Sequence, residues 1–89
     1  MKKVLVYSTR VCPFCVMAKR LLSSKGVSYE DVAVDADEAK RAEMMQRSGG
    51  RRTVPQIFIG EQHVGGFQEL SALEHQGQLD PLLADKPNG

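Results

Sequence analysis

The chain has 89 residues and two cysteines, Cys12 and Cys15, which lie three positions apart. A short apolar run from Val4 to Tyr7 precedes them, and a segment with helical periodicity begins beside them. Two cysteines at this spacing near a strand–helix junction are typical of a redox pair. The chemistry that these residues indicate is exchange between thiols and disulfides.

The start of the predicted helix gives Cys12 a special environment. Pro13 favours the first helical position, because its fixed φ suits the helix and its missing N–H would be unpaired there. Cys12 is then the N-cap and faces free N–H groups and the roughly +0.5 charge of the helix dipole. Such thiols have pKa values of about 3.5–7.5, against about 8.5 for a free one. With Arg10 adding positive charge nearby, we expect Cys12 to be the nucleophile.

Cys15 shares a predicted helix face with Ala18 and Leu22, so its sulfur should point toward the body of the protein. A buried thiol without a neighbouring charge keeps a higher pKa, which suits a resolving thiol that closes the disulfide. One alternative is that both cysteines are ordinary core residues. Another is a zinc site, but His63 and His75 offer no recognisable finger spacing, and we expect no metal.

Composition restricts the class of protein. Apolar residues make up 42%, which predicts one globular domain over residues 1–89, with a polar tail at 85–89. The net charge of +1 gives no electrostatic reason to expect nucleic acid as a partner. The first apolar run spans about four residues, too short for a signal-peptide core of about 7–15 or a membrane span of about 20. We therefore expect a cytoplasmic protein whose two cysteines are catalytic.

Hydrophobic periodicity and turn signals predict the elements. Strands are expected at residues 4–7, 27–34, 56–59 and 62–64, with a tight turn at 60–61. Helices are expected at residues 13–24, from a capping box of Asp35 and Glu38 to residues 48–50, from Gly65-Gly66 to Gly77, and in a short segment from residue 80. The second helix carries Ala39, Ala42 and Met45 on one face, and Met44 and Met45 are expected to pack in the core.

This order, β-α-β-α-β-β-α, predicts an α/β fold. The βα units at the front imply a right-handed parallel crossover, whereas the late hairpin must be antiparallel. The result is one mixed four-stranded sheet flanked by helices. The cysteine pair then follows the carboxyl end of the first strand, where open α/β sheets bind their ligands.

A second motif is the segment before the third strand, Thr53-Val54-Pro55. Proline forces Val54 toward an extended conformation, and the extended segment leaves a backbone edge that could pair with a peptide-like substrate. Proline is also common at the first residue of a strand, without any chemical role. From the sequence alone, a cis bond has a prior of only about 5–6%.

A third motif is Gly65-Gly66, which allows close backbone approach and exposes N–H groups at a helix start, a possible carboxylate site. Two adjacent glycines after a strand are more often only a turn, so this motif alone is a weak signal. Arg51 and Arg52 are candidates to bind a second carboxylate, and no role is assigned to either histidine.

Taken together, Cys12-Pro13-Phe14-Cys15, Thr53-Val54-Pro55 and Gly65-Gly66 resemble the motifs of a glutaredoxin, most closely the short bacterial dithiol type. The resemblance spans residues 3–83. It implies the thioredoxin fold and a glutathione-dependent thiol–disulfide oxidoreductase that reduces protein–glutathione mixed disulfides and protein disulfides. It also implies glutathione as reductant, with no tightly bound cofactor. Nothing in the sequence indicates more than a monomer, so we expect one.

The resemblance assigns further roles. Cys12 would attack the mixed disulfide and become glutathionylated, a second glutathione would reduce it, and Cys15 would resolve protein disulfides. Pro55 would be cis, and Val54 would pair its backbone with the cysteinyl part of glutathione. The full expected glutathione site is Thr53, Val54, Pro55, Gly66, Phe67 and Gln68, with Arg10, Pro13 and Phe14 in supporting positions.

Three departures from the family pattern affect these expectations. Phe14 replaces a common tyrosine, and Thr9 stands where a lysine is common. Gln68 replaces the aspartate that contacts the γ-glutamyl ammonium, so we expect weaker glutathione binding unless Glu69 compensates.

Two rival functions fit the sequence less well. A carrier of an iron–sulfur cluster usually has serine at the position of Cys15 and often lacks Pro13. A redoxin reduced by thioredoxin reductase tends to lack the two glutathione-binding motifs. Both rivals are therefore disfavoured.

Overall fold

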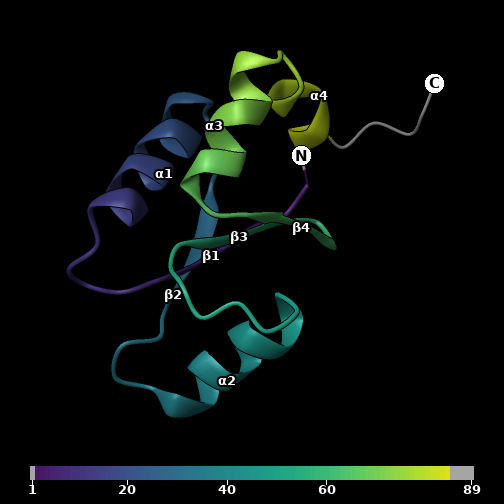
Figure 1. Ribbon diagram of the computed structural model, residues 1–89. Coiled ribbons are helices and arrows are strands. Elements are labelled where there is room, and N and C mark those ends of the chain that lie inside the picture. The colour runs from purple at the N-terminus through teal and green to yellow at the C-terminus, as the bar shows by residue number, and fades with distance from the viewer. Residues whose placement is uncertain (1, 85–89) are drawn as a thin grey trace.

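The computed structural model describes residues 2–84 and shows a sheet flanked by helices (Figure 1). Its strands are β1 (Val4–Ser8), β2 (Tyr29–Ala33), β3 (Gln56–Ile59) and β4 (Gln62–Gly65). Its helices are α1 (Pro13–Ser24), α2 (Glu38–Arg47), α3 (Phe67–His75) and α4 (Leu79–Leu83). The predicted element order is confirmed, whereas the polar tail at 85–89 lies outside the described residues.

The four strands form one mixed sheet in the order β2-β1-β3-β4. β1 and β2 are parallel because α1 crosses between them, and β3 is antiparallel to both β1 and β4. The predicted mixed sheet is therefore confirmed. β2 is shorter than the predicted strand at residues 27–34. Val27 and Val34 are buried, but they lie outside the strand.

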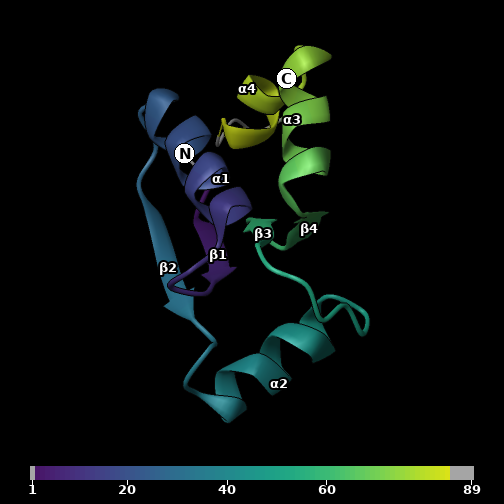
Figure 2. The ribbon, with the colours of Figure 1, turned by 60° about the vertical axis from the view of Figure 1, so that its left-hand side comes forward.

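Helices cover both faces of the sheet. α1, α3 and α4 lie on one face and α2 on the other, as Figure 1 and the turned view in Figure 2 both show. The larger core lies under α1, α3 and α4 and consists of Val4, Val6, Ala18, Leu22, Val27, Ile57, Ile59, Leu70, Leu79 and Leu83. The smaller core, under α2, consists of Tyr7, Val34, Met44 and Phe58. No helix in the described part of the chain is long and apolar enough to cross a membrane.

α1 presents the predicted face to the core, since Cys15, Ala18 and Leu22 are all buried. Its far end is joined to α3 and α4 by Lys25, whose ammonium lies 2.6 Å from Glu74 and 3.1 Å from Asp80. The hydrogen bonds to these two carboxylates raise the pKa of Lys25. α1 is therefore held along one face by the core and at its C-terminal end by these ion pairs.

The start of α2 differs from the prediction. The N-cap is Asp37, whose carboxylate accepts a hydrogen bond from the backbone N–H of Lys40 at 3.1 Å. Asp35 was expected to form a capping box with Glu38, but it lies outside the helix and binds Arg10. The capping box at Asp35 is therefore wrong, because a long-range partner takes its carboxylate.

The buried face of α2 also differs from the expected one. Ala39 and Ala42 are exposed, whereas Met44 is fully buried and Met45 is half-buried. The two methionines pack into the smaller core, as predicted, because their long side chains reach the sheet where alanine cannot.

The smaller core contains one buried hydroxyl, which two polar side chains of α2 satisfy. Tyr7 donates a hydrogen bond to Glu43 and accepts one from Arg47 at 3.0 Å. Burial and the bond to Glu43 raise the pKa of Tyr7. The Arg47 guanidinium also lies 4.5 Å from the ring centroid of Phe58, a cation–π contact. These contacts join α2 to β1 and β3.

Candidate active site

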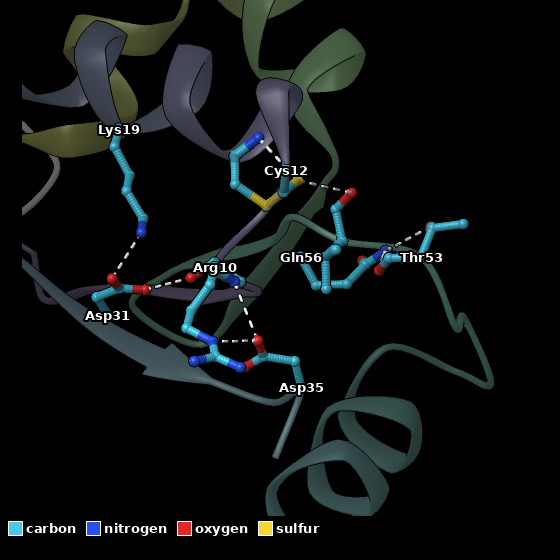
Figure 3. Close-up of a disulfide and its surroundings, with 10 residues drawn as sticks. Arg10, Cys12, Lys19, Asp31, Asp35, Thr53 and Gln56 are labelled. Atoms are coloured by element: carbon cyan, nitrogen blue, oxygen red, sulfur yellow. Dashed lines mark hydrogen bonds and ion pairs between the residues drawn. A yellow bond between two sulfur atoms is a disulfide. The ribbon is translucent and has the colours of Figure 1, made fainter. Parts of the chain in front are cut away.

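Cys12 and Cys15 form a disulfide at the start of α1, directly after β1 (Figure 3). Cys12 is the N-cap and Pro13 the first helical residue, as predicted. The Cys12 sulfur accepts a hydrogen bond from the backbone N–H of Cys15 at 3.1 Å and is partly exposed. Cys15 is only 1% exposed. The two sulfurs therefore differ in access and in polar contacts, as the sequence indicated.

Arg10 was expected to bring positive charge to Cys12, but its side chain is held elsewhere. Its Nε lies 3.1 Å from the Asp35 carboxylate, and its backbone N–H donates to the same oxygen at 3.2 Å (Figure 3). These two hydrogen bonds, the backbone one first, lower the pKa of Asp35. Much of the Arg10 charge is therefore compensated by Asp35.

A groove of about 130 Å³ begins beside the Cys12 sulfur. That sulfur lies 3.8 Å from the carbonyl oxygen of Val54, and the Val54–Pro55 peptide bond is cis, as the resemblance implied. All six residues of the expected glutathione site line the groove, namely Thr53, Val54, Pro55, Gly66, Phe67 and Gln68. Its other three lining residues are Phe14, Arg51 and Glu69. The fold thus brings together three segments that are far apart in the sequence.

The aromatic wall of the groove is formed by Phe14 and Phe67, whose rings stack with centroids 6.2 Å apart. Phe14 remains 53% exposed, so its ring is also available to a ligand or a partner. Pro13 is exposed beside it at the start of α1.

The polar end of the groove is the start of α3. Gly65 has φ +118°, and a Cβ there would lie 2.8 Å from the Glu69 carboxylate, so this position requires glycine. Gly66 donates its backbone N–H to the same carboxylate at 2.6 Å. Arg51 approaches Glu69 to 3.9 Å, whereas Arg52 lies in a different hollow beside α2. Of the two arginines considered for a carboxylate, only Arg51 is at the groove.

A charged cluster next to Cys15 was missed by the sequence analysis, which expected this thiol to lack a nearby charge. Asp31 of β2 accepts from Ser8 at 2.5 Å and pairs with Lys19 of α1 at 2.6 Å (Figure 3). These side chains line a cavity of about 160 Å³ that Cys15 also lines. The signal was Asp31 itself, a charge that interrupts the apolar pattern of a strand.

A second missed feature is the buried side chain of Gln56, which hydrogen-bonds to Thr53 and to His63. His63 stacks on Phe58 with ring centroids 4.8 Å apart, and burial, followed by the charge of Arg51, lowers its pKa. The signal was a glutamine opening an otherwise apolar strand. Within residues 2–84, no three histidine, cysteine or acidic side chains gather as metal ligands.

A cysteine pair at a helix N-terminus, beside a groove with a cis-proline, on a mixed four-stranded sheet, defines a thiol–disulfide oxidoreductase of the thioredoxin fold. The glutaredoxin family model matches residues 4–64. Glutaredoxin 3 of Escherichia coli is 55% identical over 83 residues, covering 93% of this chain and 99% of that protein. The chain belongs to the glutaredoxin family.

Solved structures agree with this assignment. The solution structure of glutaredoxin from Brucella melitensis has a TM-score of 0.81 and 49% identity, covering 93% of this chain and 89% of that one. The buckwheat glutaredoxin–glutathione complex has a TM-score of 0.82 and 32% identity, covering 90% of this chain and 74% of that one. The chain is accordingly a glutathione-dependent thiol–disulfide oxidoreductase that works through its Cys12–Cys15 pair.

Proposed function

We propose that the chain reduces protein–glutathione mixed disulfides and protein disulfides, with Cys12 as nucleophile and Cys15 as resolving thiol. The observation that carries this assignment is the difference between the two sulfurs. Cys12 is partly exposed and faces the helix N-terminus, whereas Cys15 is 1% exposed. An incoming disulfide can therefore reach Cys12, and the Cys15 N–H and the helix dipole stabilise the Cys12 thiolate.

The proposed monothiol route uses Cys12 alone. Its thiolate attacks the glutathione sulfur of a mixed disulfide, a new S–S bond forms, and the substrate leaves as a thiolate that takes up a proton. A second glutathione thiolate then attacks the bound glutathione sulfur, which releases glutathione disulfide and restores the Cys12 thiolate.

The proposed dithiol route serves protein disulfides. Cys12 first forms a mixed disulfide with the substrate protein and releases one of its two thiols. Cys15, three residues away, then loses its proton and attacks the Cys12 sulfur, and the second substrate thiol leaves. The product of that step would be a Cys12–Cys15 disulfide, and the two cysteines are paired in this way in the structure. Two glutathione molecules reduce it again.

We further propose that glutathione binds in the groove. The Val54 backbone would pair with its cysteinyl part, beside the Cys12 sulfur. The N-terminus of α3 would donate backbone N–H groups to its γ-glutamyl carboxylate near Gly66, Phe67 and Gln68. The buckwheat relative was solved as a complex with glutathione, which supports this choice of ligand. Glutathione acts here as reductant, and no tightly bound cofactor is proposed.

The test is turnover of a glutathionylated peptide by glutathione, for wild type, Cys12→Ser and Cys15→Ser. We expect Cys12→Ser to abolish all thiol exchange. Cys15→Ser should keep deglutathionylation and lose reduction of a protein disulfide. Activity that persists in Cys12→Ser would contradict the assignment of the nucleophile.

The cellular setting is also part of the proposal. We propose that residues 1–89 act as a single monomeric domain in the cytoplasm, with glutathionylated and disulfide-containing proteins as partners and without nucleic acid or membrane. A reducing compartment with a glutathione pool supports a two-cysteine catalyst. The mass in solution, measured by light scattering, tests the monomer.

A further inference from the structure

Gln56, the first residue of β3, has a fully buried side chain directly after Pro55. Its Nε2 donates to the Thr53 carbonyl oxygen at 2.9 Å and to the Thr53 hydroxyl oxygen at 3.2 Å. Its Oε1 lies 2.7 Å from Nε2 of His63 on β4. A buried amide without partners would be costly, and here both ends of the amide are satisfied.

The chemistry of these partners fixes the direction of every bond. A carbonyl oxygen only accepts, so the Gln56 NH₂ group must face Thr53 and its oxygen must face His63. The oxygen accepts in turn, so Nε2 of His63 must carry a hydrogen. The Thr53 hydroxyl oxygen receives a hydrogen bond from Gln56, which leaves its own hydrogen free to be donated elsewhere.

The series of hydrogen bonds from His63 through Gln56 ends at the Thr53 hydroxyl, which is at the active site. Thr53 lines the groove, and the next residue, Val54, has its carbonyl oxygen 3.8 Å from the Cys12 sulfur. Figure 3 shows the Gln56 amide reaching Thr53 beside the disulfide. A hydroxyl that has already accepted one hydrogen bond is a better donor, because the bonds of a chain polarise one another.

We propose that Gln56, oriented by His63, is a positioning residue that fixes the Thr53–Val54 segment and makes the Thr53 hydroxyl a donor to an oxygen of bound glutathione. The inference rests on the proposed function, because it concerns how the groove recognises its ligand. Gln56 acts only through Thr53 and is not a catalytic residue. Its effect should therefore appear in binding and not in the chemical step.

Steady-state kinetics with a glutathionylated peptide and glutathione test this role. Gln56→Met keeps the length of the side chain and removes its donors and acceptor. We expect KM for the peptide to rise about three- to tenfold, the effect of one or two ordinary hydrogen bonds, while kcat changes less than twofold. Gln62→Met, at an exposed position of β4, is the matched control and should leave both constants unchanged.

Substitutions of Thr53 show whether the hydroxyl carries the effect. Thr53→Val should raise KM as Gln56→Met does, Thr53→Ser should restore most of the binding, and the double variant Gln56→Met/Thr53→Val should add less than twofold to the larger single effect. An unchanged KM in Thr53→Val, or effects that multiply in the double variant, would overturn the inference. Thr53 is exposed, so its single variants should fold and can test the inference even if Gln56→Met does not fold.

The direction of the hydrogen bonds from His63 through Gln56 to Thr53 can be measured separately. Nitrogen-15 NMR of the imidazole should show neutral His63 with its hydrogen on Nε2, and an Nδ1–H tautomer would overturn the proposal. The proposed function and the role of Gln56 are contradicted by different results. A wild type that does not turn over the peptide contradicts the proposed function, whereas an active wild type with unaffected variants contradicts only the role of Gln56.

Discussion

Removing the carboxylate of Glu69 should destabilise the start of α3. The N-cap of this helix is Gly66, which has no side chain, so Glu69 supplies the cap by accepting the Gly66 N–H at 2.6 Å. Loss of a side-chain cap costs about 0.5–2 kcal/mol, and since the Glu69 side chain is 46% exposed we expect about 1 kcal/mol for Glu69→Ala. For a chain of this size that lowers Tm by about 4–8 °C.

Thermal unfolding followed by circular dichroism measures this change. Glu69→Gln should lower Tm by about half as much as Glu69→Ala. The amide oxygen of glutamine still accepts the hydrogen bond, but the negative charge that favours the helix dipole is gone. Glu61→Ala, exposed in the turn between β3 and β4, is the control and should leave Tm unchanged. A Glu69→Ala variant that melts within 1 °C of wild type would refute the capping role.

Substitution of Glu69 should also weaken the binding of glutathione. Gln68 is neutral, so Glu69 is the carboxylate among the residues that line the groove. We expect Glu69→Gln to raise KM for glutathione up to about fivefold, the range of an exposed ion pair of up to about 1 kcal/mol. Because such a pair is screened, the difference from wild type should shrink at high salt. A lower KM in the variant would show that the carboxylate repels the ligand.

Three further predictions concern stability. Leu22→Ala, at a fully buried position of α1, should lower the free energy of unfolding by about 2–5 kcal/mol in urea denaturation, and a loss under 1 kcal/mol would contradict its place in the core. The pKa of His63 is lowered in the native state, so the unfolded chain takes up the proton first and stability should fall as pH drops below about 6.5; His63→Gln should weaken that dependence. The backbone N–H and guanidinium of Arg10 lower the pKa of Asp35. The ionised Asp35 therefore stabilises the fold fully above about pH 3.8, and this stabilisation is lost as pH falls through the native pKa. Asp35→Asn should remove this part of the acid unfolding transition, and an unchanged loss of stability at low pH would contradict the prediction.

The sequence by itself determined the features that depend on neighbouring residues. Proline after Cys12 sets the first helical position and hence the N-cap, and the spacing of Cys15 places it on the buried helix face. The strands and the turn at Gly60 followed from apolar runs and glycine, where φ is +61°. The family motifs added the cis bond before Pro55 and the residues of the groove.

Only the tertiary structure decided the polar contacts between distant segments. The sequence analysis placed the cap of α2 at Asp35, but Arg10 binds the Asp35 carboxylate and Asp37 caps the helix. The pairing of β3 with β4 likewise brings His63 to Gln56. Such contacts depend on strand register and chain crossings, which residue spacing does not encode. The sequence therefore predicted which sulfur is accessible and which is buried, whereas the tertiary structure decided which polar contacts hold the groove beside them.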